Sequence, residues 1–255
     1  MSKRCLWCLK SEPKVTFKKK AHTIPKSLGG VNFNKNVCDS CNEYFGNRDS
    51  NNNIYSIEEA LKETFNITRK RILDSNKPKR KIGRFKSKYF EIKIKNGEYK
   101  LDLKTSFKFS LEFQTEICRA FKRGLYKMFF EELNRQKNIG YEDKYDIIRQ
   151  FARYNKGDLP VFYFLRKFGM IILTEKEVAS PILMFDRMKY LYSNEKFVEI
   201  EFLGHVFGFP ISKYTSQELE DYKIKSYYSK REFFKGVVSI KRLIDVDITL
   251  NIMNS

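Results

Sequence analysis

Ala21-His22-Thr23-Ile24-Pro25-Lys26-Ser27-Leu28-Gly29-Gly30 is the stretch that decides the fold of the N-terminal part of this 255-residue chain. A C-x-x-C pair stands on either side of it, Cys5/Cys8 before and Cys38/Cys41 after. Four thiolates in two pairs can close a tetrahedral Zn²⁺ site, and the metal then holds the loop between them. The cysteines therefore predict a structural zinc. A plain zinc ribbon would satisfy them equally well, so the residues inside the loop must indicate the function.

This arrangement resembles the zinc-embedded type of the HNH (ββα-metal) nucleases, which reads C-x-x-C, then His-x-x-Pro-x-x-Leu-Gly-Gly, then C-x-x-C-Asn. The resemblance covers about residues 3–48, less than a fifth of the chain. The matching residues are Cys5, Cys8, His22, Pro25, Leu28, Gly29, Gly30, Cys38, Cys41 and Asn42. The resemblance implies a metal-dependent HNH endonuclease that hydrolyses phosphodiester bonds in DNA.

The resemblance also implies roles for three residues. His22 is the expected general base, since an imidazole that titrates near neutrality can take the proton of the attacking water. Asn36 is expected to orient that imidazole. Asn42 is the expected ligand of a catalytic Mg²⁺ or Mn²⁺, because hard ions prefer oxygen ligands.

One position departs from the family pattern. Many members carry an acid directly before the histidine as a ligand of the catalytic metal, and this chain has Ala21 there. Glu12, Asp39 and Glu43 are the nearby acids that could replace it. The alternative is a catalytically inactive, zinc-stapled nucleic-acid-binding or adaptor subunit. A third hypothesis is a subunit whose basic surface docks RNA or an RNA-guided partner.

The charge of the chain favours a polyanionic partner. Fifty Lys and Arg against 31 Asp and Glu give a net charge of +19, and each cation placed on a phosphate releases counterions. Lys18, Lys19, Lys20 and Lys26 surround His22 in the sequence. A second basic run includes Arg69, Lys70, Arg71, Lys79, Arg80 and Lys81. Both groups are predicted to bind DNA, with RNA as a further partner, and a solvated linker is the alternative for the second.

The cysteines and the apolar segments indicate in which compartment of the cell the protein is expected. Five cysteines in this pattern favour a reducing compartment, where thiols bind zinc instead of forming disulfides. The first four residues lead directly into the zinc knuckle, not into the apolar core of a signal peptide. Since no apolar run approaches the length of a membrane span, we expect a cytoplasmic protein that does not contact a membrane.

The fold class predicted for the whole chain is α+β. Residues 1–55 form the HNH module, residues 56–88 a helix and basic linker, and residues 89–255 a larger α+β domain. That domain is assigned to target recognition, sensing or partner docking. The two-part layout resembles effectors of bacterial and phage-related conflict systems, which predicts a defence or mobile-element effector. The layout leaves open whether the chain acts alone, as a homodimer or beside a protein partner.

Several elements have clear signals. Ser56 and Glu59 form a capping box for a helix to about residue 73, and Asn96-Gly97 is typical of a two-residue hairpin turn between strands at 90–94 and 99–103. A long amphipathic helix is predicted at 111–136, with Arg119, Lys122, Arg123 and Lys127 on a solvated outer face, for which DNA contact is the alternative. A helix at 142–154 and strands at 170–174, 181–192, 197–210 and within 233–253 complete the prediction.

Overall fold

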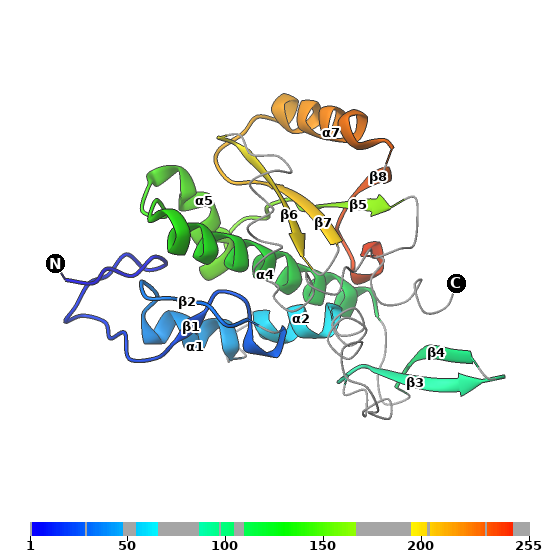
Figure 1. Ribbon diagram of the computed structural model, residues 1–255, viewed down its shortest axis with the longest axis horizontal. Helices are drawn as coiled ribbons and strands as arrows, with labels where there is room; N and C mark the ends of the chain where they lie inside the picture. The colour runs from blue at the N-terminus through cyan, green and yellow to red at the C-terminus, as the bar shows by residue number, and fades with distance from the viewer. Residues whose placement is uncertain are drawn as a thin grey trace.

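The computed structural model describes residues 2–28, 30–47, 55–65, 87–96, 98–104, 110–166, 195–202, 205–232 and 234–246. Its N-terminal module has the order strand, strand, helix (Figure 1). β1 (Ala21–His22) pairs antiparallel with β2 (Phe33–Asn34), the short helix η1 (Lys26–Leu28) lies between them, and α1 (Asp39–Gly46) follows. This is the ββα order that the resemblance implied.

Gly30 shows why the loop of the module needs a glycine. A Cβ at Gly30 would stand 1.9 Å from the carbonyl oxygen of Ile24. The backbone of residue 30 can approach Ile24 this closely only without a side chain. The glycine is therefore required by close packing inside the loop, while Gly29 lies outside the described residues.

The helix α2 (Ile57–Thr64) begins where the sequence predicts. Ser56 caps it by accepting a hydrogen bond from Glu59 N at 3.1 Å. The Glu59 carboxylate accepts hydrogen bonds from the Tyr89 hydroxyl at 3.0 Å and from Lys88 Nζ at 2.8 Å. The predicted continuation of this helix to residue 73 falls on residues 66–86, outside the described part of the chain.

The predicted hairpin is confirmed. β3 (Phe90–Lys95) pairs antiparallel with β4 (Glu98–Leu103), and the register places Lys95 opposite Glu98. Asn96 has a φ of 52°, the left-handed conformation that a primed two-residue turn requires.

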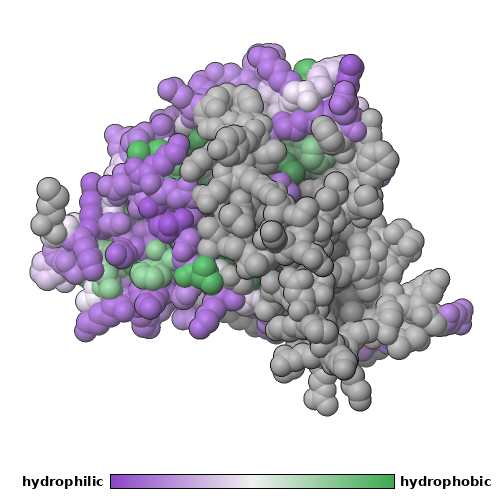
Figure 2. Space-filling model, in the orientation of Figure 1, coloured by the Kyte–Doolittle hydropathy of each residue, from purple (hydrophilic) through white to green (hydrophobic). Residues whose placement is uncertain are grey.

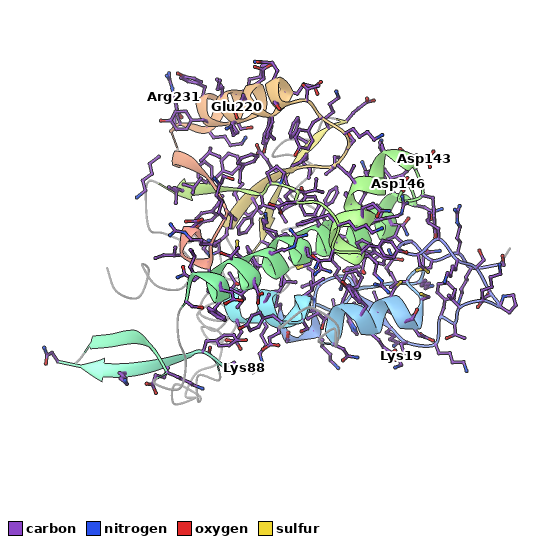
Figure 3. All side chains as sticks on the ribbon, turned by 180° about the vertical axis from the view of Figure 1, so that it is seen from behind. Lys19, Lys88, Asp143, Asp146, Glu220 and Arg231 are labelled. Carbon is purple, nitrogen blue, oxygen red and sulfur yellow. The ribbon has the colours of Figure 1, made fainter. Side chains whose placement is uncertain are left out.

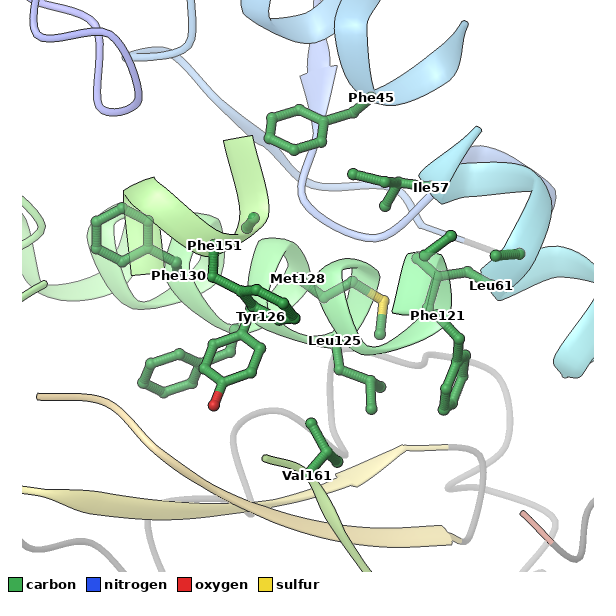
Figure 4. Close-up of a cluster of buried hydrophobic side chains, with 14 of the residues drawn as sticks. Phe45, Ile57, Leu61, Phe121, Leu125, Tyr126, Met128, Phe130, Phe151 and Val161 are labelled. Atoms are coloured by element: carbon green, nitrogen blue, oxygen red, sulfur yellow. The ribbon is translucent and has the colours of Figure 1, made fainter. Parts of the chain in front are cut away.

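The long helix α4 (Leu111–Lys137) is the centre of the molecule (Figure 1). Figure 4 shows Phe45, Ile57 and Leu61 reaching it from the side of the N-terminal module and α2, with Val161 on the opposite side. Gly124 lets α2 approach, because a Cβ there would lie 2.5 Å from Leu61 Cγ. A helix covered on two sides buries more than one stripe of its surface.

Because α4 is buried on two sides, the prediction that its cationic residues form a solvated face is wrong. The cationic side chains expected on a solvated face of α4 are largely inside the protein: Lys122 is 5% exposed, Arg123 1% and Lys127 1%. Their long side chains are matched by hydrogen bonds and ion pairs, as buried charges require. The sequence showed the helix, and its position between two layers determined which face meets water.

A four-stranded antiparallel sheet covers the other side of α4. Its strand order is β6 (Phe197–Phe202), β7 (His205–Pro210), β5 (Phe162–Arg166) and β8 (Phe234–Ser239). The helix α7 (Ser216–Lys230) packs on the outer face through Tyr222, which stacks on Phe197 with ring centroids 4.5 Å apart. Sequence reasoning missed β5 and α7, and the strands predicted at 170–174 and 181–192 lie outside the described residues.

Short helices complete the described fold. The predicted helix at 142–154 is three consecutive pieces, namely η2 (Asp143–Tyr145), α5 (Asp146–Ile148) and η3 (Arg149–Arg153), and η4 (Leu243–Asp245) follows the sheet. His205 is buried in the sheet and its Nδ1 lies 2.9 Å from the Tyr163 hydroxyl. The contact lies within the sheet, which is typical of a structural histidine.

The main hydrophobic core runs without interruption from Cys5 in the module to Val246 after the sheet. The protein is thus a mixed α+β fold, with a small cysteine-bearing N-terminal part and a larger part behind it. On the face shown in Figure 2 the described residues are mostly hydrophilic. Among the helices of the described residues, none combines the length and the apolar character needed to cross a membrane.

Candidate active site and metal centre

The four cysteines of the two C-x-x-C pairs converge. Their sulfur atoms all lie within 4.8 Å of one another, and the Sγ atoms of Cys8 and Cys38 are 3.8 Å apart. A tetrahedral site with Zn–S bonds of about 2.3 Å has sulfur–sulfur separations of about 3.8 Å. The cluster can therefore hold a metal ion with little rearrangement. Cys5, Cys38 and Cys41 are buried and Cys8 is partly exposed.

Hydrogen-bond donors reach two sulfurs of the cluster, and the pKa values of its cysteines shift in opposite directions, with burial raising that of Cys8 to about 11. Cys38 N donates to Cys5 Sγ at 3.4 Å, and Arg153 Nε donates to Cys41 Sγ at 3.4 Å. The hydrogen bond with Cys41 and those from backbone N–H groups lower the pKa of Cys5 to about 5, against the effect of burial. The pKa of Cys41 is raised by its hydrogen bond to Cys5 and by burial. Donors directed at the sulfurs are typical of groups that support a metal ligand from outside its first coordination sphere.

His22 stands on β1 with its side chain half-buried. Thr23 N donates to Asn32 O at 3.1 Å. Because hydrogen-bonded and non-bonded pairs alternate along antiparallel strands, the preceding pair, His22 with Phe33, is of the non-bonded kind. The His22 carbonyl therefore points away from β2 and needs another donor.

Lys127 of α4 is that donor. Its Nζ lies 2.5 Å from His22 O and 3.3 Å from Thr23 O. The same ammonium lies 3.2 Å from Glu131 Oε2, one turn further along α4. Both side chains are shielded from water, with 1% and 0% exposure. Burial raises the pKa of Glu131 to about 7, although Lys127 and Trp7 lower it.

Sequence reasoning missed this pair. The signal in the sequence is that Met128, Phe129 and Phe130 are consecutive apolar residues, so more than one face of α4 is apolar. A cation inside such a segment is surrounded by apolar side chains and requires an internal partner.

Three asparagines of the module lie in different environments. Asn42 is on α1, half-buried, and its side chain makes no hydrogen bond to the residues that the structure describes. The Asn36 backbone donates to Asn34 Oδ1 at 2.8 Å and accepts from Leu6 N at 2.7 Å. Asn34 is 2% exposed, and its Nδ2 donates to Glu131 O at 2.7 Å. The amide that ties β2 to α4 is therefore Asn34, which the sequence did not single out.

Two of the acids proposed to replace the missing carboxylate already have partners. Asp39 accepts hydrogen bonds from Thr16 Oγ1 and from the backbone of Lys18 and Lys19. Glu43 pairs with Lys19. Ala21 itself is 0% exposed, so a larger acidic side chain at this position would enter the core.

Glu58 of α2, which was not predicted, lies beside the lysine that binds β1. Its Oε1 is 3.9 Å from Lys127 Nζ, the ammonium that binds His22 O. A Cβ at Gly46, the last residue of α1, would be 3.8 Å from Glu58 Oε2. The Glu58 side chain keeps 33% of its surface exposed. It also lines a cavity of about 540 Å³ with Ser27 and Gly46.

The basic residues near His22 in the sequence are on the surface. Lys18, Lys19, Lys20 and Lys26 are all exposed. Lys19 lies on the outer side of α1 (Figure 3) and pairs with Glu43. Lys20 Nζ stands 5.3 Å from the centre of the Phe33 ring. Arg69, Lys70, Arg71, Lys79, Arg80 and Lys81 lie outside the described residues.

A family model described as HNH endonuclease matches residues 5–52. The chain therefore carries an HNH endonuclease module, and the four clustered cysteines are consistent with the zinc type of that family. The substrate class that such a module implies is nucleic acid. No curated protein and no solved structure matches the chain.

Proposed function

We propose that the protein is a metal-dependent endonuclease that hydrolyses phosphodiester bonds in DNA, with His22 as general base. The observation that carries the proposal is the position of His22. It lies on β1 of a ββα module, half-buried and accessible. Lys127 donates a hydrogen bond to its backbone carbonyl on the side away from β2. A histidine that solvent can reach in this way can act as general base toward an attacking water.

The other residues of the module have supporting roles in this proposal. Asn36 helps to orient the imidazole. Asn42 offers an oxygen on α1 that no described residue occupies, which suits a hard divalent ion. A bound Mg²⁺ or Mn²⁺ would stabilise negative charge on the phosphate and the leaving oxygen. Cys5, Cys8, Cys38 and Cys41 would hold a structural Zn²⁺.

Glu58 is the acid that we propose in place of the carboxylate absent at Ala21. Its carboxylate lies near Lys127, which binds β1, and near Gly46 at the end of α1. The side chain is partly open to solvent. Two of the three acids first considered in its place, Asp39 and Glu43, are occupied within the module, and the third, Glu12, is exposed.

Basic residues are proposed to bind the nucleic acid. Lys18, Lys19, Lys20 and Lys26 would contact the phosphate backbone of DNA or RNA, joined by the basic run at 69–81. We also propose that the domain boundaries lie at residues 55 and 88, and that the C-terminal part binds a second copy of the chain or a protein partner. A cytoplasmic location and a role in antiviral defence are proposed as well.

The second candidate function is an inactive nucleic-acid-binding or adaptor subunit. The specific observation in its favour is Ala21, which lies in the core and offers neither a ligand nor room for one. Both functions share the zinc cluster and the exposed lysines, so only catalysis separates them.

Cleavage of supercoiled plasmid at low salt, with Mg²⁺ or Mn²⁺ and with EDTA as control, tests the proposal. Wild type should nick or linearise the plasmid, and His22→Ala should be inactive with unchanged zinc content. Asn42→Ala should need more metal, while Asn47→Ala, an exposed asparagine just after α1, is the matched control and should behave as wild type. DNA binding without cleavage in every metal would favour the adaptor.

A further inference from the structure

We infer that Lys127 is a positioning residue for His22, so that the nuclease module is completed by a helix more than 100 residues away in sequence. This inference rests on the proposed function. It assigns to α4 a part in catalysis that the HNH segment alone, residues 5–52, does not contain.

The backbone of β1 creates the need. β1 is two residues long, and its carbonyl at His22 points away from β2. A carbonyl that points into the protein without a hydrogen-bond donor is unfavourable. Lys127 Nζ satisfies His22 O at 2.5 Å and also reaches Thr23 O at 3.3 Å. The ammonium thus fixes the strand residue whose side chain is the proposed base.

A lysine suits this position because its charge is matched on the same helix. Glu131 lies one turn away at 3.2 Å, fully buried, and is itself held by Trp7 Nε1 at 2.9 Å. Glu58 adds a second carboxylate at 3.9 Å, and the Phe45 ring centre lies 5.9 Å from the ammonium. The ammonium is therefore oriented from several sides, which leaves it little freedom to move.

One turn of α4 holds both strands of the module. Lys127 binds β1 through His22 O, and the Glu131 carbonyl accepts the Asn34 side chain of β2 at 2.7 Å. The relative position of the two strands is consequently set by α4 as well as by their own short ladder. A displacement of about 1 Å at a catalytic group can lower a rate about a hundredfold.

The test removes the donor without leaving an unpaired buried charge. In Lys127→Met combined with Glu131→Gln, both side chains are neutral, and the glutamine oxygen can still accept from Trp7. Lys122→Met is the control, because Lys122 is also buried on α4 but pairs with Asp158, away from the module. Lys127→Arg supplies a second variant that keeps a cationic donor.

Two readouts separate positioning from a general effect on folding. The first is the split between kcat and KM for plasmid cleavage. The second is the NMR signal of the imidazole Cε1–H, which is simple to follow because the chain has two histidines, His22 and His205. His22→Ala assigns the signals, and His205 in the sheet is the internal reference.

We expect the double variant to bind zinc and unfold cooperatively, with kcat about ten- to a hundredfold lower and KM little changed. Its His22 signal should shift or broaden while the His205 signal stays in place. Lys127→Arg should recover part of kcat, and Lys122→Met should match wild type. These results together would support the inference.

Other results would overturn it. An unchanged kcat and an unchanged His22 signal in the double variant would show that the contact does not position the base. Loss of zinc and of cooperative unfolding, or no recovery by Lys127→Arg, would show a general structural role instead. If wild type cleaves no substrate, the proposed function fails, and the His22 signal still decides whether Lys127 orients that residue.

Discussion

The indole Nε1 of Trp7 donates a hydrogen bond of 2.9 Å to the carboxylate of Glu131. Trp7 belongs to the first C-x-x-C pair and Glu131 to the central helix, so this bond joins the proposed zinc knuckle to the rest of the protein. Both side chains are fully buried. The same carboxylate pairs with Lys127, which binds the strand of His22. Metal centre and proposed base are thus connected through one buried glutamate.

The buried carboxyl predicts a dependence of stability on pH. Burial raises the pKa of Glu131 to about 7, whereas an unfolded glutamate titrates near about 4.3. The folded protein therefore binds this proton more tightly, and the stability it contributes is present below about pH 4.3 and is lost as the pH rises through 7. Between pH 5 and 8, wild type should lose on the order of 3 kcal/mol relative to Glu131→Gln.

Urea unfolding of both proteins at several pH values, with zinc in excess, measures this difference. The comparison isolates Glu131, because all other titrating groups are shared. Parallel stability curves for the two proteins would contradict the raised pKa.

Removal of the metal should be visible through Trp7, the single tryptophan of the chain. Its ring packs against Phe45 and Phe130, with centroids 4.8 and 5.1 Å away. Because a structural zinc contributes folding energy, chelation or Cys38→Ser should expose the indole and shift its fluorescence to longer wavelength. Cys118→Ser, at the cysteine outside the cluster, is the control. An unshifted spectrum after complete zinc loss would show that the module is stable without metal.

The exposed lysines should contribute to DNA affinity through counterion release. Lys18→Ala and Lys26→Ala should each weaken binding regardless of sequence and reduce the slope of log K against log salt by about 0.9. Lys144→Ala, at a lysine paired with Glu142, should leave the slope unchanged. Equal slopes for wild type and both module variants, measured by fluorescence anisotropy, would remove these lysines from the interface.

Glu58 should affect the divalent metal required for cleavage and leave the zinc unaffected. If its carboxylate supplies the charge absent at Ala21, Glu58→Gln should raise the Mg²⁺ or Mn²⁺ concentration for half-maximal cleavage about tenfold or more. Glu59→Gln is the control, because Glu59 is directed to Lys88 and Tyr89. A common metal titration curve for all three proteins would rule out Glu58 as the replacement.

Local signals in the sequence predicted the elements with strong chemical requirements. The hairpin at Asn96 followed from a turn that needs positive φ, and the start of α2 followed from the capping residue Ser56. β5 was missed, because a short buried strand has no periodic pattern of its own. α7 was missed because, among its described contacts, it packs on the sheet through few residues, Tyr222 in particular.

The amino-acid sequence by itself determined the HNH module, because the spacing of Cys5, Cys8, Cys38 and Cys41 around His22 specifies a small loop that a metal can close. Only the tertiary structure decided which residues of α4 pack against that module. The burial of Lys127 depends on β1, α1 and α2 packing on one side of α4, where its ammonium lies near His22 O, the Phe45 ring and Glu58. No local pattern specifies this, since whether a cation lies in water or binds the carbonyl of His22 depends on layers that distant segments supply.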